Sequence, residues 1–314
     1  MTIAAALMLY VAAILALGPK LLSHITADGG APRLAIAAWT TAVVMVIGCS
    51  VAAIALLLVE AAGHWDSPDS LLVSCLERLR AILLGHAGLP ARWVATVAVA
   101  IAVGSLVAVV VRIGRAMSRM RIHTFAHADA VRLVGKSHGS DVVVIEAAEP
   151  AAYCVAGRPP AIVVTTAALA ALDEAQLAAV VAHERAHLDG RHAYVVAAAR
   201  GLTAALPKFG LFTSAATHIG ALLEMCADDT AARRHGRQPL LTGLLTLSGA
   251  FTPAHGLAAA GIAVLTRAVR LSDPPRGMAR MQAQVTLSGA VAAMAATPLA
   301  IVALALTGAL ICFA

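Results

Sequence analysis

The chain has 314 residues, of which 60% are hydrophobic and only 13% are charged. Soluble globular proteins usually carry about a quarter charged residues, so the composition argues against an ordinary soluble enzyme and indicates a protein that lies in a lipid bilayer. The net charge of +6 does not indicate nucleic-acid binding, because the basic residues gather beside an apolar segment, where they more often set membrane orientation. We therefore expect no direct binding of nucleic acid.

Four apolar segments are predicted to span the bilayer, which takes roughly 20 mainly apolar residues. They cover residues 3–17, 34–59, 93–111 and 285–314. The first is expected to end at Gly18 and Pro19, because a proline removes a helix hydrogen bond. The chain is therefore predicted as an α-helical, multi-pass protein of the cell membrane, with three spans before a central segment and one after it.

The charge pattern predicts the orientation of these spans, because basic residues beside a span favour the cytoplasmic side. A membrane region at 1–111 is expected to precede a cytoplasmic domain at 112–284, and 285–314 forms the last helix. Both termini and the 60–92 loop are then outside the cell. Five arginines after the third span carry this prediction: Arg112, Arg115, Arg119, Arg121 and Arg132.

The central segment begins with a mixture of helix and strand. The third span should continue as a helix that ends near Gly135. Short β-branched runs then predict strands. These runs cover residues 142–145, 152–155 and 162–166.

Helices are predicted to complete the central segment. Asp173 and Gln176 form the pattern of a capping box, which opens a helix. A second long helix should cover residues 215–234. Gly236 is expected to end that helix. The apolar residues 239–268 are also expected to be helical, with interruptions at Pro253 and Gly256.

The helix that Asp173 opens carries the sequence VVAHERAHLDGRH, in which His183, Glu184 and His187 form an HExxH motif. Residues four apart share one helix face, with Cβ atoms about 5–6 Å apart, so the two imidazoles can bind one zinc ion. Glu184 can then act as general base toward a zinc-activated water. The apolar residues before the motif favour this interpretation over a solvated polar face, because buried imidazoles need partners and a metal supplies them.

A catalytic zinc site needs a third protein ligand and one open position. Few acidic residues follow His187, and two of them, Glu224 and Asp228, lie four apart on the second predicted helix. Apolar residues flank Glu224, which favours a ligand over a solvated carboxylate. Asp228, one turn further on, is predicted to accept the free N–H of a ligand histidine. We therefore predict one Zn²⁺ per chain, held by His183, His187 and Glu224.

Three other histidines have no assigned role. His192 either supports the site or caps the end of its helix. His218 and His235 flank the helix that carries Glu224, and either could stabilise an oxyanion. The sequence does not choose between them.

With these motifs in place, the chain resembles the BlaR/MecR membrane metallopeptidases, which are transducers of β-lactam resistance. The resemblance rests on three spans, a zinc domain with HExxH and a later ExxxD, and a fourth span. The run AYCVAGRPPAIVVT at 152–165 resembles the family's strand–turn–strand segment, and DDTAA at 228–232 resembles its continuation after ExxxD. The related Ste24/HtpX-type membrane proteases share both metal motifs.

The resemblance implies a mainly α (α+β), gluzincin-like zinc metallopeptidase domain. In it, His183, His187 and Glu224 bind zinc, Glu184 is the general base, and Asp228 supports a ligand histidine. It also implies cleavage of a cytoplasmic protein, typically a BlaI/MecI-like winged-helix repressor in a signalling pathway. An extended substrate would pair with an edge strand of the enzyme. The residues of that strand are Ile162, Val163, Val164 and Thr165.

The sequence departs from the BlaR/MecR pattern in one respect and leaves other interpretations open. It contains no SxxK motif, so we expect no penicillin-binding sensor domain and no sensing of β-lactams through a serine of this chain. One alternative is a Ste24/HtpX-like protease for quality control of membrane proteins. Another is a non-catalytic membrane transducer with a closed, four-ligand zinc site. The oligomeric state stays open, a homodimer included.

Overall fold

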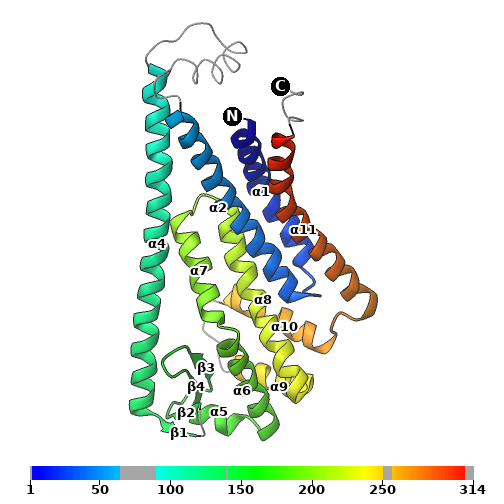
Figure 1. Cartoon of the computed structure of the whole chain (residues 1–314). Helices are drawn as coiled ribbons and strands as arrows, with labels where there is room; N and C mark the ends of the chain where they lie inside the picture. The colour runs from blue at the N-terminus through cyan, green and yellow to red at the C-terminus, as the bar shows by residue number, and fades with distance from the viewer. Residues whose placement is uncertain (1, 64–89, 139–140, 250–256, 308–314) are drawn as a thin grey trace.

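The computed structural model describes residues 2–63, 90–138, 141–249 and 257–307. Helices make up most of the molecule, and a small four-stranded sheet lies at one end (Figure 1). The mostly helical character predicted from the sequence is confirmed. Most of the 60–92 loop, together with the predicted interruptions at Pro253 and Gly256, lies outside the described residues.

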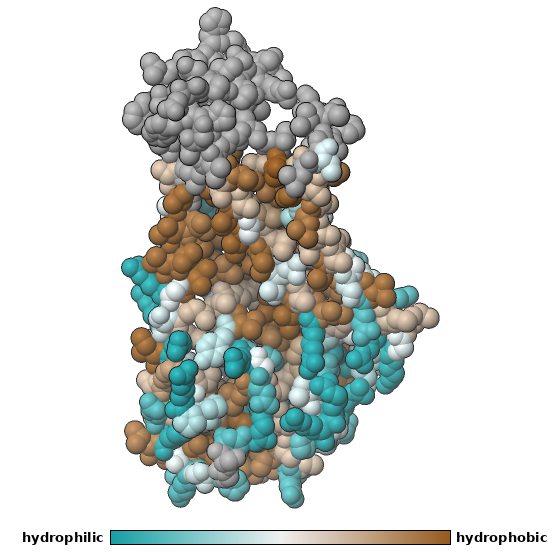
Figure 2. Space-filling model, viewed as in Figure 1, coloured by the Kyte–Doolittle hydropathy of each residue, from teal (hydrophilic) through white to brown (hydrophobic). Residues whose placement is uncertain are grey.

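Three helices among the described residues are long and apolar enough to cross a membrane. The start of the first and the end of the last lie at the same end of the bundle (Figure 1), as expected for termini on one side of a membrane. On the face shown in Figure 2, apolar residues gather around this bundle and hydrophilic residues gather at the opposite end of the molecule. The three helices are α1 (Thr2–Thr26), α2 (Pro32–Gly63) and α11 (Gly277–Leu306).

The prediction that the first span ends at Gly18 and Pro19 is wrong, because α1 runs through both residues to Thr26. Trp39 Nε1–H of α2 donates a hydrogen bond to Thr26 Oγ1 at 3.3 Å. Leu22, one turn earlier, is buried in the core of the bundle. Packing of this last part of α1 against α2 outweighs the cost of an internal proline, which is about 3 kcal/mol.

The third predicted span forms the first part of α4 (Pro90–Val134), a helix of 45 residues. At 1.5 Å per residue it is about 68 Å long, more than twice the roughly 30 Å of a bilayer's hydrocarbon core. It therefore extends well beyond a membrane, and it ends beside the sheet, next to Gly135 as predicted. Several side chains of 93–111 lie outside the described part of the chain, so a fourth span stays a prediction.

The sheet has the strand order β1-β2-β4-β3. β4 pairs in parallel with β2 and antiparallel with β3, and β1 pairs antiparallel with β2. The three strands predicted from β-branched runs are therefore confirmed to within one residue. The strands are β1 (Lys136–Ser137), β2 (Val142–Ile145), β3 (Ala152–Val155) and β4 (Ala161–Thr165).

The prediction that Ile162, Val163, Val164 and Thr165 form an edge strand for a substrate is wrong. These residues lie in β4, whose two edges already pair with β2 and β3. Every β4 residue is buried, and the Thr165 hydroxyl accepts the backbone N–H of Ala168 at the start of α5. A β-branched run predicts a strand but not its place in the sheet. On this side of the sheet, the edge strand is β3.

In the described part of the chain, six further helices lie between the sheet and α11. The capping box at Asp173 is present: Gln176 N–H donates to Asp173 Oδ1 at 2.8 Å, and Asp173 N–H donates to Gln176 Oε1 at 3.2 Å. Gly236 ends the second long helix, as predicted, with φ at 86°. The helices are α5 (Thr166–Ala171), α6 (Glu174–Asp189), α7 (His192–Ala205), α8 (Gly210–His235), α9 (Arg237–Gly249) and α10 (Leu257–Ser272).

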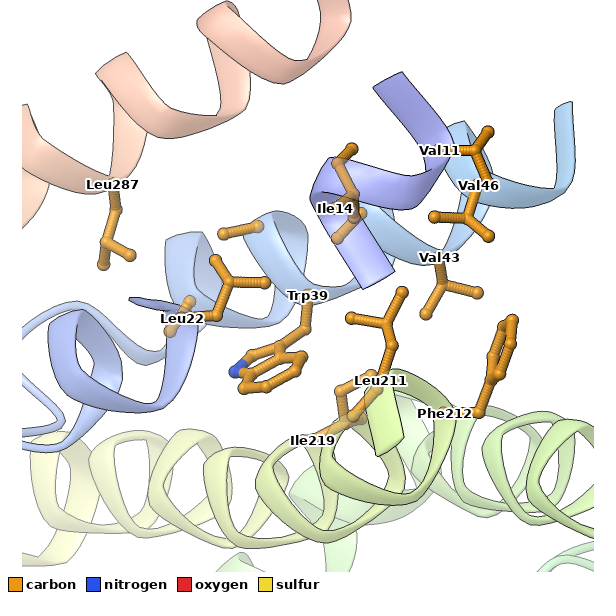
Figure 3. Packing of buried hydrophobic residues seen from close by; sticks show 14 of the residues in the cluster. Val11, Ile14, Leu22, Trp39, Val43, Val46, Leu211, Phe212, Ile219 and Leu287 are labelled. Atoms are coloured by element: carbon orange, nitrogen blue, oxygen red, sulfur yellow. The ribbon is translucent and has the colours of Figure 1, made fainter. Parts of the chain in front are cut away.

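The α7–α8 pair enters the bundle that the membrane helices form (Figure 1). Leu211, Phe212 and Ile219 of α8 are buried beside Trp39 and Val43 of α2 (Figure 3). Partly buried side chains of α7 pack against the same cluster. The membrane helices and the helices of the central segment therefore share one core across the predicted boundary near residue 111.

Replacing Gly29 with alanine should destabilise the protein. Gly29 lies in the α1–α2 loop with φ at +57°, and an added Cβ would lie 2.6 Å from Met225 Sδ of α8. The left-handed conformation alone costs a residue with a Cβ about 1–2 kcal/mol, and the close contact adds to that cost. Thermal unfolding in detergent should show a lower Tm for Gly29→Ala. Gly48→Ala is the matched control, because nothing lies within 4 Å of its added Cβ; an equal loss in both variants would contradict the assignment.

Candidate metal centre and active site

The HExxH motif lies in the second half of α6, and two contacts fix this helix in place. The capping box fixes its start. Arg185, between the two motif histidines, donates Nε–H to Asp141 Oδ2 and a terminal N–H to Asp141 Oδ1, both at 2.8 Å. Because Asp141 directly precedes β2, this two-point ion pair ties the motif helix to the sheet.

The three predicted ligands come together between α6 and α8. His183 Nε2 and His187 Nε2 are 3.1 Å apart, and each lies 3.5 Å from an oxygen of the Glu224 carboxylate. Zinc with bonds of about 2.0–2.1 Å in a tetrahedron places its ligand atoms about 3.4 Å apart. The observed separations therefore fit one zinc ion. Among the described residues, this is the one group of three such side chains that could hold a metal.

The charges around the three ligands also fit a divalent cation. Three carboxylates surround the two histidines, those of Glu184, Glu224 and Asp228. One guanidinium, that of Arg267, lies among them. With neutral imidazoles the group carries two more negative than positive charges, which a Zn²⁺ ion would neutralise. Burial by itself lowers the pKa of His183, but the neighbouring Asp228 and Glu224 outweigh it and raise that pKa to about 9. The site therefore favours positive charge at this point.

Asp228 lies next to the first histidine of the motif, for which it was predicted to accept a hydrogen bond. Its side chain is 1% exposed, and its Oδ1 lies 3.1 Å from His183 Nδ1. This is an ion-pair distance, although the ring N–H is not aligned well enough on the oxygen for a hydrogen bond. Because Nδ1 faces Asp228, Nε2 is directed toward His187 and Glu224. The contact thus leaves Nε2 as the nitrogen that would bind a metal. A terminal nitrogen of Arg267 lies 3.3 Å from this Nε2.

Arg267, on α10, holds the acidic residues of the site and was missed by the sequence analysis. Its Nε–H donates to Asp228 Oδ2 at 2.9 Å and one terminal N–H donates to Asp228 Oδ1 at 2.7 Å. Its other terminal nitrogen lies 3.1 Å from Glu224 Oε2. Burial by itself raises the pKa of Glu224 and of Asp228, but the neighbouring groups outweigh it and hold both below their usual values. For Glu224 these groups are first His183 and His187 and then Arg267, and for Asp228 they are first Arg267 and then His183. An arginine in a mostly apolar segment was the signal that could have indicated a buried acidic partner.

Glu184 lies beside the edge strand β3. Its carboxylate lies near the thiol of Cys154 on that strand, close enough for the two groups to shift each other's pKa. Burial raises the pKa of Glu184, and the two motif histidines offset part of this rise. Burial and the neighbouring Glu184 raise the pKa of Cys154 to about 12, so the thiol stays protonated. Cys154 was also missed, because a single cysteine in a strand carries no sequence signal for this contact.

The three unassigned histidines have different surroundings. His192, at the start of α7, lies with its Nδ1 2.8 Å from His187 Nδ1, so one of these nitrogens carries the hydrogen and the other accepts it. His218 stacks on Trp39 in the bundle, with ring centroids 4.9 Å apart. His235 is the exposed last residue of α8. Of the three, His192 is the one that contacts a predicted metal ligand.

Residues 116–271 match the family model of peptidase family M48. The chain carries an M48 metallopeptidase domain. No curated protein and no solved structure matches the chain. The M48 domain includes α6, α8 and α10, which carry the metal ligands and Arg267. Two of the three apolar helices precede this domain and one follows it, and together with the match they support a membrane metalloprotease.

Replacing Arg267 with alanine should destabilise the M48 domain strongly. The change leaves the buried Asp228 carboxylate without its two-point partner, and breaking a buried ion pair costs about 3–5 kcal/mol. Arg276→Ala is the matched control, because Arg276 pairs with Asp273 where both side chains are mostly exposed and such pairs contribute about 0–1 kcal/mol. Unfolding in detergent, followed by circular dichroism, compares the two. Similar losses in both variants would contradict the role given to Arg267.

Proposed function

We propose that the protein is a zinc endopeptidase that cleaves polypeptides at the site between α6, α8 and β3. The observation that carries this proposal is the convergence of His183, His187 and Glu224, with Glu184 beside them. Zinc bound there would polarise a substrate carbonyl and lower the pKa of a water ligand to about 7. The M48 match supports the same chemistry.

The residues of the chain have separate tasks in this proposal. Glu184 takes the proton of the attacking water and passes it to the leaving amine. Asp228 contacts Nδ1 of His183, and His192 contacts Nδ1 of His187. Each contact lies on the side of the imidazole away from the metal position and orients the ring. Cys154 lies beside the Glu184 carboxylate on the β3 side. The backbone of β3, the edge strand next to α6, offers unpaired groups to an extended substrate.

A catalytic role fits the site better than a purely structural one. A structural zinc site is closed by four protein ligands, whereas a catalytic site has three and one open position. Within the described ranges, the metal group has three members. This supports an enzyme over the alternative of a non-catalytic transducer.

Two substrate classes remain within the proposal. The resemblance to the BlaR/MecR family favours a cytoplasmic, BlaI/MecI-like repressor. The shared core of the M48 domain and the spanning helices favours a protein that reaches the site from the membrane, as in quality control. Quantitative proteomics of cells with the wild-type protein or Glu184→Gln separates the two: either a repressor or a set of membrane proteins accumulates in the variant.

Glu184→Gln should lose about 10²–10⁴-fold or more in proteolysis while it retains zinc. The amide is nearly the same size as the carboxylate but cannot accept the proton of water. Cleavage of a protein substrate and metal content, measured on the same preparation, test this. Glu174→Gln is the matched control, because it makes the same change at an exposed position of the same helix. Unchanged turnover in Glu184→Gln would remove this residue from the mechanism.

The M48 domain should face the cytoplasm, with both termini outside. The arginines after the predicted third span motivate this orientation. In a background without native cysteines, Ala148→Cys places a thiol at an exposed position of the β2–β3 loop. This thiol should react with a membrane-impermeant maleimide only after the cells are opened. Labelling of intact cells at this position would reverse the orientation.

A further inference from the structure

The last part of α10 has its charged side chains inside and apolar side chains outside. The side chains of Arg267 and Arg270 are only 12% and 11% exposed, because both pair with aspartates of α8. Leu265 and Val269 are 63% and 58% exposed, and they share one face because they are four residues apart. A helix at the surface of a soluble protein has the opposite arrangement. This face therefore suits contact with lipid better than contact with water.

Contacts of α10 with the α1–α2 loop give the level of this face relative to the membrane. Residues 27–31 join α1 and α2, which are consecutive candidate spans, so this short loop lies at the membrane surface. Arg270 Nε–H donates to the Gly29 carbonyl of the loop at 3.1 Å. Leu265 precedes Arg270 by about 7.5 Å along the helix axis, which is about the thickness of one headgroup layer. Leu265 therefore lies within that layer's depth of the loop at any tilt of α10.

The start of α11 lies at the same level and is also apolar outside. A Cβ added to Gly30 of the α1–α2 loop would lie 3.0 Å from Ala283 Cβ of α11. Met278, Met281 and Val285 share one face of α11 by their spacing, and each is more than half exposed. Figure 1 shows α10 crossing the end of the bundle from which α11 rises. Exposed apolar side chains therefore continue from α10 across the junction into a candidate span.

Basic side chains surround this level of the molecule. Arg33 at the start of α2 is exposed, as are Arg276 and Arg280 at the α10–α11 junction. Exposed cations beside an apolar face are typical of a helix that lies in the membrane interface, where they meet anionic headgroups. A second copy of the chain is a poorer partner, because a two-fold interface places the same patch against itself and would bring these arginines together.

We propose that α10 is a membrane-surface helix, which inserts Leu265 and Val269 between the headgroups and acyl chains of the leaflet on the M48 side. The partner of this face is the lipid bilayer. The opposite face carries Arg267, which contacts Asp228 and Glu224. The metal centre therefore lies about one helix diameter, roughly 10 Å, from the lipid. A polypeptide meets the site at the membrane surface, and the lipid contact itself does not depend on proteolysis.

Spin-label depth measurements test the insertion. The full-length protein, in a background without native cysteines, receives a nitroxide at Leu265→Cys or at Val269→Cys and is reconstituted into vesicles of phosphatidylcholine and phosphatidylglycerol. Oxygen concentrates among acyl chains, whereas a neutral nickel chelate stays in water. The ratio of the collision rates with these two reagents should be several-fold higher for both labels than for Leu133→Cys. Leu133 is the matched control, an exposed leucine of α4 beside the sheet.

Leu299→Cys, at an exposed position of the candidate span α11, gives the ratio expected for full contact with acyl chains. A ratio at Leu265 and Val269 equal to that at Leu133 would overturn the proposal, because the face would then lie in water. Slow collisions with both reagents would also overturn it, because protein rather than lipid would cover the face. Both labelled positions are exposed, so the nitroxide displaces no packed neighbour, and circular dichroism checks that the helices are retained.

Discussion

The site depends on one buried carboxylate, that of Asp228. A buried charge is costly unless it is paired, and Asp228, at 1% exposure, has two partners. His183 Nδ1 lies on one side, so the other nitrogen of this histidine faces the metal position. The Arg267 guanidinium lies on the other side, and it reaches Glu224 as well. One side chain therefore sets the orientation of one predicted ligand directly and of another through a shared arginine.

A second aspartate–arginine pair between α8 and α10 joins the M48 domain to the membrane helices. One turn after Arg267 on α10, Arg270 forms a two-point ion pair with Asp229 and donates to the Gly29 carbonyl of the α1–α2 loop at 3.1 Å. α10 is followed by α11, a candidate span. Two neighbouring aspartates on α8 thus bind two arginines on α10, one at the metal centre and one at the end of the membrane bundle. The geometry of the metal centre and the packing of the bundle are coupled through α8 and α10.

Much of the site could be predicted from the sequence because its signals are local. The HExxH spacing, the capping box at Asp173 and the β-branched runs depend on residues within a few positions of one another. The pairing of Glu224 with this motif followed from its apolar neighbours and from the four-residue spacing to Asp228. What was missed depends on contacts between distant segments. Nothing near Cys154 indicates that β3 is the edge strand beside Glu184, and the order of the strands follows from packing alone.

The first helix and the α7–α8 pair also show that local sequence patterns do not predict contacts between distant segments. Gly18 and Pro19 are a local stop signal, yet α1 continues because Leu22 and Thr26 pack in the bundle. The apolar stretches of α7 and α8 are too short for the sequence to predict that they belong to the membrane bundle. Their contacts with α2 show that they do. Local patterns predicted the elements and the chemistry, while the packing determined where the elements meet.

Metal analysis of the purified protein tests the central claim most directly. The wild type should contain one zinc per chain, and the double variant His183→Ala with His187→Ala should contain almost none. Replacing His127 and His235 with alanine, two histidines outside the metal group, controls for the loss of two imidazoles and should leave zinc content unchanged. A full equivalent of zinc in the His183→Ala, His187→Ala variant would contradict the assignment of the metal centre.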